Sequence, residues 1–242
     1  MFDHEQRVGV EVAARLDELI RVNSAGVLTQ TSRNDLEAAI RRAGRQNRSD
    51  AQPAAMQAAD IHTERMQRVS LDLFTEQIEG LTDDPERAAE MRRIASEADI
   101  GPMAEAVGER QAELVESIRE EATEKLIAKV IAAAETSGDL EARAARVLVQ
   151  IDDVWSMTRD RADRVAAWES ESMNTEFAQV YNLANRIGSY RWVDMDDDKV
   201  RPLHRARDGQ IFEWANPPDD EPYDGHPGVP PNCRCKAEPI LT

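Results

Sequence analysis

The sequence predicts a mainly α protein, with an elongated helical N-terminal part and a small α+β, loop-rich C-terminal module. Apolar residues recur at steps of three or four over most of residues 3–187, which is typical of helices with one buried face. The same stretch is rich in Ala, Glu and Arg, which favour helix. The composition then changes, because eight of the 11 prolines lie from Pro202 onward and five of the 11 aromatic residues from Tyr190 onward.

The helical part divides where glycine, proline and polar residues interrupt the apolar pattern. Asn34 is a candidate N-cap, and Asp84-Pro85 combines a capping residue with a proline in the first turn. Glycines at Gly80, Gly101 and Gly108 indicate breaks. We expect helices over residues 8–19, 36–43, 61–78, 85–100, 109–136, 140–154 and 162–187.

Charge and composition exclude several classes of protein. The 242-residue chain has 30 Lys and Arg against 47 Asp and Glu, a net charge of −17, and such a surface repels a nucleic-acid backbone. No apolar run approaches the roughly 20 residues that cross a bilayer, so we expect no membrane partner. Two cysteines cannot form a disulfide framework. Histone-like DNA condensers, integral membrane proteins and disulfide-rich miniproteins are therefore excluded.

The C-terminal segment has the pattern of short strands joined by turns. Residues 190–195 alternate in polarity as a strand does, and the charged run 196–199, three aspartates and a lysine, is a polar turn. We expect a return strand to begin at Val200-Arg201, and a further strand at residues 210–214 after the turn Asp208-Gly209. A proline-rich loop over residues 216–231 then leads to a closing strand.

An ordered series of residues runs through this segment. Its members are Trp192, Asp197, Val200, Arg201, His204, Asp208, Gly209 and, after the proline-rich loop, Asn232, Cys233, Arg234 and Cys235. The series closely resembles the motif of the phage Mu F-like proteins, the minor head or head morphogenesis family of tailed phages. The resemblance covers about residues 138–242 and is strong from residue 190. The upstream helix 161–169 is also similar, although Ala167 and Trp168 replace the family's Arg-Thr pair.

The resemblance implies a structural, non-enzymatic protein that associates with the portal vertex or head interior during capsid assembly and DNA packaging or ejection. Residues 138–189 would be the helical part of the family domain and residues 190–242 its motif-bearing module, while residues 1–137 have no counterpart. The implied partners are portal and capsid proteins, with packaged DNA as a further candidate. Several copies per virion, made in the host cytoplasm, are expected.

Two cysteines and two histidines suggest zinc as a cofactor. Thiolate and imidazole are ligands that zinc prefers, and Cys233, Cys235, His204 and His226 would complete a tetrahedron. In an extended segment, Cys-x-Cys places both side chains on one face. The alternative is a pair of buried, reduced thiols in a reducing cytosol. In both cases we expect Cys233, Cys235 and His204 to lie close together.

A metal-dependent nuclease or processing factor is the alternative function, with His204 as general base and Asp208 and Asn232 holding a metal. We favour the interpretation that His204 and Asp208 anchor turns, with no catalytic residue in the chain. The acids around Asp197 lack the glycine and closing glutamate of a calcium loop, so a solvated turn is expected. We expect Asp197 to pair with Arg201. Arg234 is expected to pair with one of the acids near Asp197.

Two further groups of side chains have alternative interpretations. A basic cluster in the N-terminal part is either a contact for DNA or an acidic partner, or a solvated helix face; it consists of Arg33, Arg41, Arg42, Arg45 and Arg48. The aromatic residues Trp192, Phe212 and Trp214 are either a binding platform or the core of the module. We favour the structural interpretation for both groups.

Overall fold

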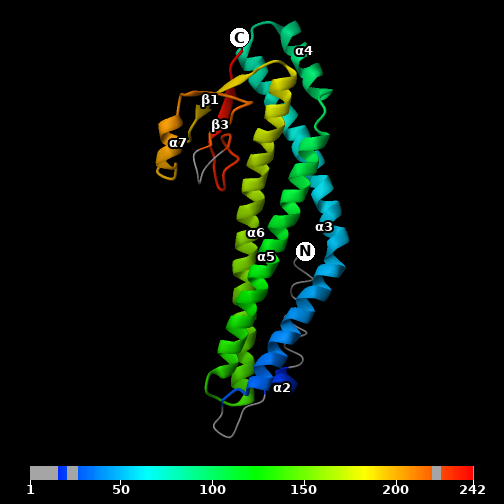
Figure 1. Cartoon of the computed structure of the whole chain (residues 1–242), viewed down its shortest axis with the longest axis vertical. Coiled ribbons are helices and arrows are strands. Elements are labelled where there is room, and N and C mark those ends of the chain that lie inside the picture. The colour runs from blue at the N-terminus through cyan, green and yellow to red at the C-terminus, as the bar shows by residue number, and fades with distance from the viewer. Residues whose placement is uncertain (1–15, 21–26, 220–224, 242) are drawn as a thin grey trace. The chain divides into compact units, whose positions relative to one another are not determined.

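The computed structural model describes residues 16–20, 27–219 and 225–241 (Figure 1). The chain is mainly α, as predicted, with a small antiparallel sheet near its C-terminus. The described elements are α2 (Leu16–Leu19), α3 (Gln30–Leu81), α4 (Pro85–Ser96), α5 (Gly101–Glu135), α6 (Leu140–Ala184), β1 (Ser189–Val193), α7 (Pro202–Arg207), β2 (Ile211–Glu213) and β3 (Lys236–Pro239). None of the helices in these ranges is long and apolar enough to span a membrane.

The chain forms two compact units, each built from two separate segments. The first unit combines residues 1–58 with 112–163, and the second combines residues 59–111 with 164–242. Helices α3, α5 and α6 therefore each contribute one part to each unit. The expected assignment of separate roles to residues 1–137, 138–189 and 190–242 stays a prediction.

The core of the first unit lies mainly between segments of α3, α5 and α6, and Leu19 of α2 is also buried in it. Leu36 and Ile40 of α3 are buried with Leu126 and Val130 of α5 and with apolar residues of α6 that follow a three- and four-residue spacing, namely Val147, Ile151 and Val154. Arg143 of α6 donates to the backbone carbonyls of Ala134 and Gly138, and so satisfies acceptors at the end of α5. Regular spacing on each helix thus produces one shared apolar core.

The second unit has a core of larger side chains. Phe74 and Ile78 of α3 pack with residues of α4, α5 and α6, among them Met91, Val107, Met173, Phe177 and Tyr181. Helix α4 begins as predicted, because the carboxylate of Asp84 accepts from the backbone N–H groups of Glu86 and Arg87 and Pro85 follows directly. The aromatic rings of Phe74 and Tyr181 lie 5.8 Å apart.

Several predicted helix boundaries are wrong. Helix α3 is continuous through Pro53, so residues 36–43 and 61–78 belong to one helix and Asn34 is not its cap. Helix α5 includes Gly108, and α6 is one helix that ends at Ala184 rather than at residue 187. Most of the helix expected over residues 8–19 lies outside the described residues. Only its last four residues are described, and they form α2.

The sheet has the strand order β2-β1-β3 and both pairings are antiparallel. In this register Tyr190 pairs with Phe212 on one side and with Pro239 on the other. The return strand expected at Val200-Arg201 is wrong, because Pro202 there starts helix α7. Pro202 occupies the first helical position, where a missing N–H costs nothing.

Candidate metal centre

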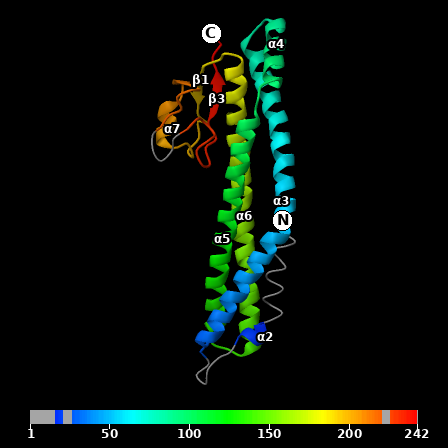
Figure 2. The same cartoon turned by 45° about the vertical axis from the view of Figure 1, so that its right-hand side comes forward.

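The C-terminal module, residues 189–241, is anchored to α6 by side chains from one face of that helix. The Trp168 indole donates to the Val229 carbonyl at 3.0 Å, the Thr175 hydroxyl to the Pro227 carbonyl at 2.7 Å, and the Gln179 amide to the Trp214 carbonyl at 2.8 Å. Figures 1 and 2 both show β1, β3 and α7 on the same side of α6. The module is therefore held to α6 both before the proline-rich loop, at Trp214, and within its last part, at Pro227 and Val229.

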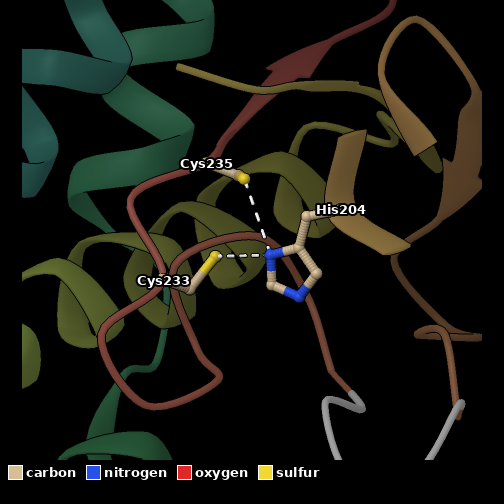
Figure 3. A group of neighbouring side chains, drawn as sticks. All are labelled: His204, Cys233 and Cys235. Atoms are coloured by element: carbon tan, nitrogen blue, oxygen red, sulfur yellow. Dashed lines mark hydrogen bonds between the residues drawn. The ribbon is translucent and has the colours of Figure 1, made fainter. Parts of the chain in front are cut away.

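His204, Cys233 and Cys235 form a buried cluster inside this module (Figure 3). The His204 Nδ1 lies 3.4 Å from the Cys233 Sγ and 3.7 Å from the Cys235 Sγ. The exposed fractions of the three residues are 1%, 3% and 5%. Their ligand atoms all lie within 4.8 Å of one another. The prediction that these residues lie close together is confirmed.

The local backbone directs both cysteines to the same side. Cys233 and Cys235 alternate with Arg234, which is exposed and binds Asp197 at 2.7 Å, as predicted for an acid in this turn. The Gly228 N–H donates to the Cys233 Sγ at 3.3 Å. Gly228 has a φ of +90°, and a Cβ there would lie 2.7 Å from the Thr175 hydroxyl, so only glycine fits.

His204 of α7 packs against Trp192 of β1. The two rings are edge-to-face with 5.2 Å between their centroids, and the Arg207 guanidinium lies 5.0 Å from the same indole. Arg201, the residue before α7, donates to the Pro231 carbonyl and so connects α7 to the segment that carries the cysteines. The imidazole therefore has a defined position and orientation.

Burial and mutual hydrogen bonding control protonation in this cluster. Burial lowers the pKa of His204 and so favours the neutral imidazole. The hydrogen bond with Cys235 lowers the pKa of Cys233, while the same contact, together with burial, raises the pKa of Cys235. The two thiols thus lose one proton readily and the second with difficulty.

The remaining motif residues stabilise the turns of the module. Asp208 accepts from the Asp194 N–H at 2.9 Å, and the Gly209 N–H donates to the Trp192 carbonyl at 2.8 Å. Gly209 and Asn232 both have a left-handed backbone, with φ values of 73° and 57°. The Val200 N–H donates to the Asp197 carbonyl. Trp192 and Trp214 are buried with Tyr190 and both cysteines, and Phe212 packs against them, so the aromatic residues form the core as favoured.

His226, the fourth predicted ligand, lies apart from the cluster. Its Nδ1 is 2.9 Å from the Tyr190 hydroxyl, and its ring packs 5.0 Å from the Trp214 ring. Burial lowers the pKa of His226 to about 4, so it is neutral at physiological pH. In the described part of the chain, His204, Cys233 and Cys235 are the only group of three ligand side chains close enough to share a metal.

The residues proposed for a nuclease do not form an accessible reactive group. Asp208 and Asn232 are exposed, whereas the imidazole of His204 is enclosed by the core. A general base must lie within hydrogen-bond reach of the proton it takes, and a polynucleotide cannot reach a buried ring. The arrangement suits a structural role.

The basic cluster belongs to the first unit. Arg33 pairs with Glu135, and Arg41 pairs with Glu37 and Glu124. Arg42 and Arg45 are exposed, while the side chain of Arg48 lies outside the described residues. A contact with DNA or an acidic partner stays a prediction.

Sequence reasoning missed an ionic cluster in the second unit. Arg110 of α5 binds Glu176 at 2.8 Å and Glu169 at 3.1 Å, both on α6. Glu169 is 3% exposed, and its burial raises the pKa of its carboxyl. The seven-residue spacing of the two glutamates places them on one face of α6 and was the available signal. Nothing in the local sequence identified Arg110 as their partner.

Fold and site together define a mainly helical protein with a small motif-bearing module at its C-terminal end, organised around a buried thiol and imidazole cluster. The family model described as Phage Mu protein F like protein matches residues 106–238, more than half of the 242-residue chain. The chain therefore belongs to the phage Mu protein F-like family. The match includes residues 106–137, which corrects the expectation that everything before residue 138 lacks a family counterpart.

A curated relative gives a second comparison. The chain is 36% identical over 129 residues to a protein of Haemophilus influenzae (strain ATCC 51907 / DSM 11121 / KW20 / Rd) that is described as an uncharacterized protein. The alignment covers 53% of this chain and 27% of the relative, so the chain matches about a quarter of that protein's length. No solved structure matches the chain.

Proposed function

We propose that this chain is a structural minor head protein of a tailed phage, which associates with the portal vertex or head interior during capsid assembly and DNA packaging or ejection. The proposal rests on the family match, together with the structural contacts that the motif residues make. Trp192 and His204 are buried, Asp197 binds Arg234, and Asp208 closes a turn. These contacts stabilise the fold of the module, which supports the proposal that the protein is structural and not an enzyme.

The C-terminal module is the proposed docking part. Hydrogen bonds from three positions of α6 hold it to that helix, so it is suited to rigid binding. Its edge strand β2 exposes an apolar side chain, Ile211, at 62%. Apolar side chains at a rigid surface bind a partner at a low cost in conformational entropy. The proposed partners are the portal protein and the capsid proteins of the same phage.

Binding of purified portal protein to the full chain tests this role. We expect binding by the wild type and weaker binding by Ile211→Glu, which places a charge on the proposed docking part. Val149→Glu on α6 of the first unit is the matched control, because Val149 is also 62% exposed. Equal binding by all three proteins would contradict docking through the module. Binding to capsid protein alone would move the proposal from the portal to the capsid shell.

The proposal includes location and copy number. We infer that the chain is made in the host cytoplasm and is carried in the virion in several copies. The net charge of −17 fits a protein that lies beside packaged DNA without adhering to it. Cleavage of plasmid DNA by the purified chain with added Mg²⁺ or Zn²⁺ would instead support the nuclease alternative.

A further inference from the structure

We propose that the Nδ1 of His204 and the sulfurs of Cys233 and Cys235 bind one zinc ion, which cross-links α7 to residues 232–235. The three side chains come from two segments separated by the proline-rich loop (Figure 3). All three are buried and point toward one another. The ion would be structural, since it lies inside the core of the module and not at its surface.

The distances between the ligand atoms match a tetrahedral zinc site. Zn–S bonds of about 2.3 Å and Zn–N bonds of about 2.0–2.1 Å at tetrahedral angles place sulfur and nitrogen roughly 3.5 Å apart. The observed separations are 3.4 Å and 3.7 Å from the His204 Nδ1 to the two sulfurs. The two sulfurs also lie within 4.8 Å of each other, so the three ligand atoms can converge on one ion. The described ligands supply three of the four positions of a tetrahedral site.

Neighbouring contacts hold the ligands in place as the surroundings of a metal site do. The Gly228 N–H donates to the Cys233 sulfur and stabilises a thiolate there. Trp192 packs against the His204 ring. The ion pair of Arg234 with Asp197 and the bond from Arg201 to the Pro231 carbonyl hold residues 231–235 against the start of α7. The site is thus organised before a metal arrives.

The composition of the module gives zinc a physical purpose. Among the described residues of the module, five form its buried hydrophobic cluster, and two of them are the cysteines. Small, loop-rich modules often need a metal or a disulfide to supplement such a core. Soft sulfur donors with an imidazole select zinc over magnesium or calcium, which prefer oxygen. Two thiols and a histidine that meet in the core are therefore better explained by zinc than by packing alone.

Metal content of the intact chain tests the site. The protein is purified with a histidine-free tag, under reducing conditions and without a chelator. Its zinc content is then measured by inductively coupled plasma mass spectrometry. We expect about one zinc per chain in the wild type and an at least tenfold lower content in His204→Gln, Cys233→Ser and Cys235→Ser. His226→Gln is the matched control, because His226 is buried in the same module but lies outside the cluster. The His226→Gln variant should therefore retain its zinc.

Cobalt substitution distinguishes loss of the site from loss of folding. Cobalt-loaded wild type should show intense visible bands of a tetrahedral ion and a sulfur-to-cobalt charge-transfer band. Each single serine variant should lose part of the charge-transfer intensity even where some metal remains bound. A wild type that stays free of metal after reduction and zinc loading would overturn the proposal. Equal zinc in the wild type and in a Cys233→Ser/Cys235→Ser double variant would also overturn it.

Discussion

The indole ring of Trp192 contacts side chains of both α7 and β2. His204 and Phe212 meet it edge-on at 5.2 Å and 5.8 Å between centroids, and the guanidinium of Arg207 lies 5.0 Å from it. The residue has no exposed surface. Its side chain therefore connects the central strand to the helix that carries His204.

Trp192→Ala should destabilise the module by about 3–5 kcal/mol, because it leaves a cavity that the surrounding rings cannot fill. Hydrogen exchange of the β1 and β3 backbone amides measures this loss without depending on tryptophan fluorescence. Ile211→Ala on β2 is the control and should change stability by less than about 0.5 kcal/mol, since Ile211 is exposed. Equal effects of the two substitutions would contradict the assignment of Trp192 to the core.

His226 should make the module sensitive to acid. Its pKa is about 4 when folded and about 6.5 when unfolded, so the unfolded chain binds more protons between these values. The contribution of His226 to stability should therefore rise with pH from about 4 to 6.5, by about 3 kcal/mol, and then stay constant. Unfolding by urea across this range measures the slope.

His226→Gln should make that slope shallower. A slope of the same sign should remain, because burial also lowers the pKa of His204. An unchanged slope in the variant would show that His226 is charged or accessible in the folded state.

At the residue scale, much of the site could be predicted from spacing alone. Cysteines two residues apart in an extended segment share a face, and His204 and Asp197 occupy fixed places in the family motif. The position of His226 could not be predicted, because its partner Tyr190 lies 36 residues away in the chain. His204 and Cys233 are also 29 residues apart, but both belong to the family motif, whereas Tyr190 and His226 do not.

Helix boundaries show where local signals are overruled by packing. Pro53 and Gly108 are unfavourable in helix interiors, by roughly 3 and 1 kcal/mol, yet α3 and α5 continue through them. Val107 beside Gly108 is fully buried, and residues of α3 on both sides of Pro53 belong to buried clusters. Burial of these side chains outweighs the local cost. The start of α4 was predictable because Asp84 and Pro85 act through adjacent backbone groups.

The pairing of α5 with α6 in the second unit depends on Arg110. Arg110→Met should cost several kcal/mol, up to about 3–5, because Glu169 would remain buried without its counter-charge. Thermal unfolding followed by circular dichroism measures the loss. Arg93→Met on α4 is the control, since the ion pairs of Arg93 are exposed and contribute little.

The triple variant Arg110→Met/Glu169→Gln/Glu176→Gln should be more stable than Arg110→Met, because no charge is left without a partner. A triple variant less stable than the single one would contradict this account of the cluster.

At the scale of the whole molecule, the sequence predicts the fold class but not the division into compact units. The change in composition near residue 190 separates the helical part from the sheet-containing module. Each compact unit, however, combines segments that lie far apart in the chain, which local periodicity does not encode. The same limit applies to Arg110, whose partners lie 59 and 66 residues away.

The central proposal is that this member of the phage Mu protein F-like family serves as a structural component of the phage head. Quantitative mass spectrometry of purified particles, with heads separated from tails, tests it most directly. We predict that the chain fractionates with heads, in several copies and at a constant ratio to portal protein. Finding the chain only in the lysate and not in heads would contradict the claim.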